Sequence, residues 1–232
     1  MTRMALRILA LETSTLDASV AALEGDRLLG QTVLDRTRRT AQCFAPAILH
    51  QLHSVGWRPQ DVQLVAVSQG PGSFTGLRVG VTAAKTLAYA VGAEVFAVNT
   101  LQVIARQTPA ELPCICAVLD AQRQQLFVAE FRREGELLVE TAATRIEDNA
   151  QWLAGLSPGT AVTGPGLAAW RDKLPPGLVV VDAGCWTPRA ATVGLAAWLE
   201  HRAGNRHDVW TLNPIYYRTS AAEEKKLAVK GN

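Results

Sequence analysis

The residues best placed to do chemistry in this chain form one glycine-rich loop, GPGSFTGLR, at residues 70–78. Its members are Gly70, Pro71, Gly72, Ser73, Phe74, Thr75, Gly76, Leu77 and Arg78. The three glycines permit positive φ and close backbone approach, and the proline stiffens the turn. The serine or the threonine can cap a following helix, whose N-terminus beside the arginine would suit an anion. The loop therefore predicts either a phosphate site or a rigid structural or docking turn.

The glycine spacing separates this loop from the common phosphate-binding motifs. No G-x-x-x-x-G-K-[ST] pattern of a Walker A loop can be drawn through it. Its glycines read G-x-G-x-x-x-G, which differs from the dinucleotide fingerprint. Both interpretations of the loop stay open on the sequence alone.

Small residues mark the helix that is expected after the loop. They are Gly80, Ala83, Ala84 and Ala88, on neighbouring faces at helical spacing. Small side chains let another backbone come close. The helix can use them to pack on its own sheet, to form an interface with a partner helix, or to do both.

The elements that must position the loop follow from hydrophobic periodicity. In the first block, strands are expected over 8–11, 18–23, 28–34, 62–67 and 95–98, with helices over 40–56, 77–91 and 101–106. In the second block, strands are expected over 114–119, 126–131, 137–141, 161–163 and 178–181, with helices over 146–153, 167–173 and 190–203. A three-strand meander followed by alternating helices and strands thus occurs twice. This order predicts an actin-like (ASKHA, ribonuclease H-like) duplicated α/β fold, with two mixed sheets flanked by helices and subdomains at 1–108 and 109–232.

Composition narrows the class of protein. The chain has 232 residues, 48% of them hydrophobic, and a formal net charge of +2. These values exclude wholesale disorder, and the charge is too weakly basic to indicate nucleic-acid binding by this chain alone. No apolar run approaches the roughly 18 residues of a membrane span, so we expect a cytoplasmic protein with no membrane partner. Four cysteines are expected to be reduced: Cys43, Cys114, Cys116 and Cys185.

The loop and its surroundings resemble the signature of the TsaB (YeaZ-like) family, which has a Gcp-like, M22-type domain. GPGSFTGLR follows an apolar strand and is followed by VGVTAAKTLA, as in that family. Further segments that resemble it are Ile8–Ser14, Val98–Leu101, Asp120–Arg123 and Pro214–Arg218. The resemblance runs in order along nearly the whole chain. It departs at Glu12, where an aspartate is usual in the family.

The resemblance implies a role as well as an actin-like fold. The role is that of a non-catalytic subunit in the machinery that makes threonylcarbamoyladenosine next to the anticodon of tRNA. A TsaD-like partner would carry the metal and transfer the threonylcarbamoyl group, and a TsaE-like ATPase would complete the system. ATP and metal are therefore expected on partner subunits, and tRNA is reached through the complex. Self-association through the N-terminal half is expected when TsaD is absent.

An actin-like phosphotransferase would need a carboxylate and glycines at its first turn. That turn is Glu12, Thr13 and Ser14, which supply a carboxylate but no glycine and could be a vestigial phosphate site. Asp182–Gly184, after a later strand, could be a second phosphate loop or an ordinary turn. Catalytic residues are therefore not expected in this chain.

Other candidate groups are weaker. His50 and His53 could share a helical face, but no third ligand is identifiable, so no metal site is expected. Arg36, Arg38 and Arg39 form a small basic cluster that is either a solvated face or a contact for tRNA phosphates. The six tryptophans are scattered, and no stacking platform can be traced through them.

Three hypotheses about function remain. The first is a scaffold subunit that docks TsaD through its two main N-terminal helices. The second is a stand-alone ATP-dependent phosphotransferase or hydrolase that uses Glu12 and Asp120 as metal carboxylates. The third is a homodimer that acts without TsaD.

Overall fold

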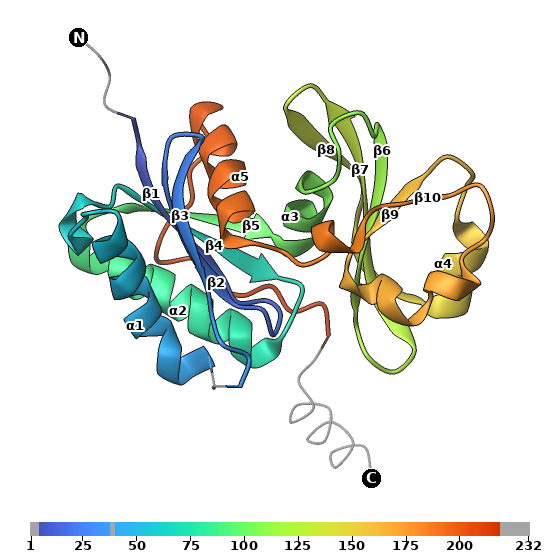
Figure 1. The fold of residues 1–232 in the computed structure, drawn as a ribbon, viewed down its shortest axis with the longest axis horizontal. Coiled ribbons are helices and arrows are strands. Elements are labelled where there is room, and N and C mark those ends of the chain that lie inside the picture. Colours follow the sequence, from blue (N-terminus) through green and yellow to red (C-terminus); the bar gives the residue numbers. More distant parts are fainter. Residues whose placement is uncertain (1–4, 38–39, 219–232) are drawn as a thin grey trace.

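The computed structural model describes residues 5–37 and 40–218 and contains two five-stranded mixed sheets (Figure 1). The first has the order β3-β2-β1-β4-β5. Its strands are β1 (Arg7–Glu12), β2 (Ser19–Glu24), β3 (Arg27–Val33), β4 (Leu64–Gly70) and β5 (Glu94–Asn99). The first three strands are antiparallel, and the last two run parallel to β1. Strands β1 and β4 are buried on both faces, which explains their continuous apolar runs.

The second sheet repeats this plan with the order β10-β9-β6-β7-β8. Its strands are β6 (Cys114–Asp120), β7 (Gln125–Glu134), β8 (Leu137–Asp148), β9 (Ala161–Thr163) and β10 (Val179–Val180). Again an antiparallel meander, β6-β7-β8, is extended by two strands parallel to its first member. The predicted duplicated, actin-like α/β fold with two mixed sheets is confirmed.

Helices separate and cover the two sheets in five layers (Figure 1). Helices α1 (Thr40–Ser54) and α2 (Phe74–Val91) cover the outer face of the first sheet. Helices α3 (Thr100–Arg106) and α5 (Ala190–Arg202) lie between the sheets, α5 against the first and α3 mainly against the second. Helix α4 (Asn149–Gly155) covers the far side of the second sheet.

The chain returns to its first sheet near its C-terminal end. Helix α5 packs on β1 and β2 so closely that a Cβ on Gly194 would lie 2.4 Å from Leu23 Cδ1. Residues 205–218, here called the C-terminal strap, then run past β5, where His207 Nδ1 accepts a hydrogen bond from Ala97 N at 3.0 Å. The predicted subdomain boundary between residues 108 and 109 stays a prediction. Two segments that follow it, α5 and the C-terminal strap, pack against the first sheet.

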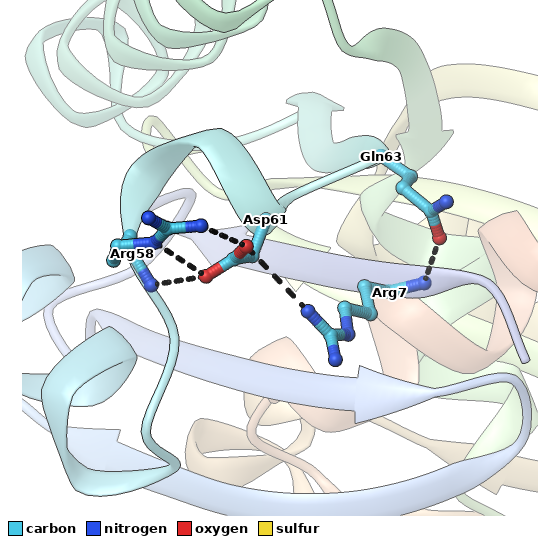
Figure 2. A network of polar contacts seen from close by, with 4 residues as sticks. All are labelled: Arg7, Arg58, Asp61 and Gln63. Atoms are coloured by element: carbon cyan, nitrogen blue, oxygen red, sulfur yellow. Dashed lines mark hydrogen bonds and ion pairs between the residues drawn. The ribbon is translucent and has the colours of Figure 1, made fainter.

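A small polar network joins β1 to the turn that leads into β4 (Figure 2). The Asp61 carboxylate accepts from Arg58 N at 2.7 Å and lies 3.7 Å from Arg7 Nη1. Arg7 N donates to Gln63 Oε1 at 2.9 Å. The side-chain hydrogen bonds from Arg58 hold the pKa of Asp61 below its usual value. This network lies at the opposite end of β1 from Glu12, away from the glycine-rich loop.

Two helices expected in the second block differ in the structure. Residues 146–148 end strand β8 instead of starting a helix, and α4 begins at Asn149, where Asp148 caps it by accepting from Ala150 N at 2.9 Å. The reason is that β8 pairs with β7 along its whole length, which overrides local helix preference. The helix expected over 167–173 is two short 3₁₀ turns, Pro165–Ala169 and Arg171–Lys173. The other expected elements are present, with ends shifted by no more than three residues, except that β8 ends at Asp148 and not at residue 141.

Within residues 5–37 and 40–218, no helix is long and apolar enough to cross a bilayer. Two members of the predicted arginine cluster, Arg38 and Arg39, lie outside the described residues.

Candidate functional site

The glycine-rich loop connects the end of β4 to the first turn of α2. Ser73 is the N-cap residue, and its hydroxyl oxygen accepts from Gly76 N at 3.2 Å, which confirms the predicted cap. The Gly70–Pro71 peptide is cis, and Gly70 has φ +126°. A Cβ at Gly70 would lie 2.5 Å from the Ile215 carbonyl oxygen. The loop is therefore a tight turn packed beneath the C-terminal strap.

The turn after β1 lies directly against this loop. Ser73 N donates to the Ser14 carbonyl oxygen at 2.7 Å. A Cβ on Gly72 would lie 2.4 Å from the same oxygen, and one on Gly76 would lie 2.0 Å from the Thr13 oxygen. Cβ atoms do not approach other atoms so closely, so two loop glycines are required for this backbone contact.

Glu12 lies beneath this contact and is fully buried. One carboxylate oxygen accepts from both the backbone N, at 2.6 Å, and the hydroxyl of Ser14. The other accepts from the Ser68 hydroxyl at the end of β4. Burial raises the pKa of Glu12, and the three hydrogen bonds offset this only in part. The carboxyl group thus cross-links β1, its turn and β4.

The predicted vestigial phosphate site is brought together with the loop, but its polar groups face other protein atoms. Ser14 N is bonded to Glu12, Ser73 N to Ser14, and Gly76 N to Ser73. A phosphate needs free N–H groups at such a position, and a metal ion needs an accessible carboxylate oxygen. These residues therefore do not fit a nucleotide phosphate or its metal. In the part of the chain that the structure describes, no cluster of three or more His, Cys, Asp or Glu side chains could hold a metal ion.

The small residues of α2 serve the packing of this chain. Gly80, Ala84 and Ala88 are buried, and a Cβ on Gly80 would lie 2.2 Å from Thr13 Oγ1. Ala83 is half-buried at the edge of the core cluster that α1 shares with α2. An interface through α2 stays a proposal, and it would use the exposed side of the helix. The exposed residues of that side are Thr75, Arg78, Thr82, Thr86, Tyr89 and Ala90.

The C-terminal strap clamps the loop from the other side. The Tyr216 ring lies 4.5 Å from the Phe74 ring, measured between centroids. Arg78 Nε donates to the Tyr216 hydroxyl at 3.0 Å, and the guanidinium carbon lies 3.9 Å from the Phe74 centroid. In this structure Arg78 is held against aromatic rings, which explains why the loop ends in a long, flat cation.

The next two strap residues contact the second half of the molecule. The Tyr217 ring lies 6.1 Å from Phe127, and its hydroxyl accepts from Asn99 Nδ2 at 3.5 Å. Arg218 Nη1 donates to the Ala121 carbonyl oxygen at 2.6 Å, and Arg218 is also bonded to the Gln125 side chain. The strap therefore links the loop of the first half to the β6–β7 turn of the second. The resemblance marked this segment, but the sequence did not reveal its contacts.

The remaining candidates do not join this site. Asp182 caps a short 3₁₀ turn by accepting from Gly184 N at 2.8 Å, as an ordinary turn does. Asp120 is exposed at the end of β6 and accepts from Gln122 N at 2.8 Å. His50 and His53 are exposed on α1.

The charged and thiol candidates also lie apart. Arg36 forms an exposed ion pair with Asp17. All four cysteines are free, and burial raises the pKa of the Cys116 thiol to about 12.

Sequence reasoning missed a second Gly-Pro-Gly. Gly164, Pro165 and Gly166 directly follow β9, and Gly70, Pro71 and Gly72 begin at the last residue of β4. Gly164 has φ +115°, and a Cβ there would lie 2.1 Å from the Val118 carbonyl oxygen. The repeated tripeptide after a buried strand was a visible sign of the duplication.

Comparisons with known proteins agree with this architecture. The family model described as "TsaD: tRNA N6-adenosine threonylcarbamoyltransferase" matches residues 31–168. The tRNA threonylcarbamoyladenosine biosynthesis protein TsaB of Escherichia coli K12 is 30% identical, over 95% of this chain and 98% of that protein. TsaB of Bacillus subtilis 168 is also 30% identical, but the match covers 63% of this chain and 64% of that protein. The chain thus spans slightly less than two thirds of the Bacillus relative.

Solved structures share the fold. YeaZ from Pseudomonas aeruginosa is 23% identical and superposes with a TM-score of 0.79, over 91% of this chain and 99% of that one. An uncharacterized Pseudomonas aeruginosa protein with similarity to peptidase YeaZ is 24% identical, with a TM-score of 0.78 over 92% of this chain and 100% of that one. From the family model, the full-length similarity to the Escherichia coli protein and the shared fold, this chain belongs to the TsaB (YeaZ-like) family.

Proposed function

We propose that this chain is a non-catalytic partner subunit in the synthesis of threonylcarbamoyladenosine on tRNA, and that it docks and activates a TsaD-like transferase. One observation carries the non-catalytic part. Glu12, the carboxylate at the end of β1, is buried, and its oxygens accept three hydrogen bonds from Ser14 and Ser68. The loop backbone covers the turn where a phosphate would have to lie. At this turn, therefore, the carboxylate that an actin-like phosphotransferase would use is not accessible to a metal ion or a phosphate.

The docking surface that we propose is the outer layer of α1 and α2. Within the described residues, these two helices form an outer layer on the first sheet, and the C-terminal strap contacts one side of α2 (Figure 1). Leu49 on α1 is 48% exposed, and the small residues Thr86 and Ala90 are exposed on α2. A large apolar side chain beside small ones lets the helices of a partner pack closely. Two helices of a similarly built partner could pack on this layer as a four-helix bundle.

The same layer would account for the other proposed partners. A second copy would occupy it when TsaD is absent, giving a homodimer. A TsaE-like ATPase would join the complex that contains TsaD, and ATP and metal would lie on those subunits. The complex would act on tRNA in the cytoplasm. Activation would then follow if this chain binds the active arrangement of TsaD more tightly than other arrangements.

Reconstitution of tRNA modification tests the role. Modification by TsaD, TsaE and the threonylcarbamoyl-adenylate synthase should require this chain. Modification at the full rate without it would refute the partner role. Turnover of magnesium–ATP by the isolated chain at ordinary enzymatic rates would instead support the phosphotransferase hypothesis.

Matched charge substitutions test the surface. Leu49→Glu places a charge in the proposed interface and should abolish TsaD binding in pull-down and calorimetry. Leu137→Glu is the control, because Leu137 is 46% exposed but lies on the second sheet. If both variants bind TsaD equally well, the interface lies elsewhere.

A further inference from the structure

The side of α2 that faces the C-terminal strap carries a row of polar and aromatic side chains. Arg78, Thr82, Lys85 and Tyr89 follow one another at spacings of four, three and four residues. At 100° per residue they fall within a sector of about 60°, and the row is about 16 Å long. The core-facing residues Gly80, Ala84 and Ala88 lie on a different side of the helix. The row is therefore a surface feature, separate from the packing face.

The strap forms the other wall of a hollow along this row. The hollow has a volume of about 620 Å³, and we call it the α2–strap groove. Its lining residues are Arg78, Val81, Thr82, Lys85, Leu212, Asn213, Pro214 and Tyr216. No carboxylate is among them.

The two cations of the groove have no acidic partner among the described residues. Lys85 Nζ donates to the carbonyl oxygens of Leu212 at 2.8 Å and Trp210 at 3.3 Å. Arg78 uses its Nε for the Tyr216 hydroxyl. Both positive charges are thus held along the groove, and no carboxylate of residues 5–37 and 40–218 is paired with either, which favours an anionic occupant.

Exposed aromatic rings lie at both ends of the groove. Tyr89 and Trp210, each 69% exposed, meet edge to face with centroids 5.3 Å apart. At the other end Tyr216 is 40% exposed. Large rings left open to water beside fixed cations are the components of a single-strand nucleic-acid groove, in which bases stack and phosphates pair.

We propose that the α2–strap groove binds a short single-stranded stretch of RNA, with phosphates at Arg78 and Lys85 and bases stacked on Trp210 and Tyr89. An acidic peptide would match the cations, but it would not use the stacking surface at both ends. The choice of RNA as the nucleic acid rests on the proposed function. The inference that the groove binds an anionic chain with flat rings rests on its cations and exposed aromatic rings alone. The weak net charge of +2 does not oppose this, because the cations act locally.

Binding of a labelled single-stranded heptaribonucleotide of mixed sequence to the isolated full chain, followed by fluorescence anisotropy, tests the proposal. Two phosphate contacts should raise the Kd about sevenfold between about 50 and about 200 mM salt. Trp210→Ser should raise the Kd about 5- to 150-fold, and Tyr89→Ser should act similarly, because each removes a stacking ring. A blunt RNA duplex should bind more weakly, since its bases are not free to stack.

A second cation–aromatic pair supplies the control. Lys173 Nζ lies 5.0 Å from the Trp170 ring centroid, in the second half of the molecule. Trp170→Ser and Lys173→Gln should leave the Kd within twofold of the wild type. Circular dichroism melts must show that Trp210→Ser and Tyr89→Ser are folded, which we expect because both side chains are exposed.

Two outcomes would overturn the proposal. One is no binding at low salt, and the other is an equal Kd for the wild type and Trp210→Ser. If Trp210→Ser also loses TsaD binding in the second case, the groove is a protein interface. The RNA assay uses this chain alone, so its failure would be distinct from a failure of the reconstitution that tests the partner role.

Discussion

The two halves of the molecule share a strand order and a Gly-Pro-Gly at the end of the fourth strand. They differ at the first hairpin turn, where the carboxylate that starts the turn is buried after β1 and exposed after β6. In the first half, the turn after β1 buries Glu12 and is covered by α2, a helix of 18 residues. In the second half, Gly-Pro-Gly leads into a 3₁₀ turn of five residues, and Asp120 stays exposed. The half with the long helix after Gly-Pro-Gly thus has the buried carboxylate at its turn, and the half with the short 3₁₀ turn has the exposed one.

The open turn of the second half adopts an unusual backbone. Gln122, Arg123 and Gln124 have φ values of 61°, 54° and 61°. Each non-glycine residue in this left-handed region costs about 1–2 kcal/mol. Hydrogen bonds from Arg218 to Ala121 and Gln125, on either side of the three residues, help to hold them in place. In the first half, the turn packs directly against the loop glycines. In the second half, hydrogen bonds from the C-terminal strap hold a strained turn.

Adding a methyl group to the third residue of each tripeptide should give the largest contrast. Gly72→Ala would place a Cβ 2.4 Å from a backbone oxygen at φ +155°, so we expect a loss of about 3–5 kcal/mol in the free energy of unfolding. Gly166→Ala has no positive φ and would meet Leu126 Cδ2 at 2.9 Å and the Leu119 backbone at 3.2 Å, so we expect a smaller loss of about 1–3 kcal/mol. Urea unfolding measures both. Equal losses would contradict the comparison.

The buried carboxyl of the first half should make stability depend on pH. Because burial raises the pKa of Glu12 above 4.5, the folded chain keeps a proton that the unfolded chain has lost. Stability should therefore fall as the pH rises from about 4.5 to the folded pKa, by at most about 1.4 kcal/mol per pH unit.

The Glu12→Gln side chain cannot titrate. This variant should remain folded, and its free energy of unfolding should not decrease in this way as the pH rises. Urea unfolding at a series of pH values compares it with the wild type. Asp120→Asn is the control in the second half and should keep the fall, because Glu12 is still present. A fall of the same size in Glu12→Gln would assign it to other groups.

Glycine substitution should relieve the strained turn but not the buried one. Gln122→Gly removes a left-handed side-chain penalty, and we expect a gain of about 0.5–1 kcal/mol in thermal or urea unfolding. Thr15→Gly in the first-half turn has no positive φ to relieve, so we expect a loss of similar size. Destabilisation by both would show that the left-handed conformation carries no strain.

The two tyrosines of the strap should give the smallest contrast. Tyr216→Phe removes the acceptor of a 3.0 Å hydrogen bond from Arg78 and should cost about 1 kcal/mol. Tyr217→Phe removes a 3.5 Å contact with Asn99 and should cost less than about 0.5 kcal/mol. Urea unfolding measures both losses. A larger loss for Tyr217→Phe would show that the Tyr217 hydroxyl, and not the Tyr216 hydroxyl, contributes more to stability.

Much of the fold could be predicted because the strands carry local signals. The apolar run of β4, the cap at Ser73 and the helical spacing of α2 can all be read within a few residues. What could not be predicted depends on partners far apart in the chain. The pairing of Tyr89 with Trp210, the bonding of Ser68 to Glu12 and the return of α5 to β1 have no local pattern. The resemblance identified the strap segment, but only the structure shows that it joins both halves.

The packing of α5 on the first sheet has a consequence during synthesis. About 90 residues separate the end of β5 at Asn99 from the start of α5 at Ala190. At roughly 5–20 residues per second, a ribosome needs about 5–20 s to make them. For that time the inner side of the nascent sheet, including Ile8, Ala10 and Leu23, lacks the helix that finally shields it. The newborn chain should therefore depend on holding chaperones until α5 emerges, and truncation before residue 190 should yield insoluble protein.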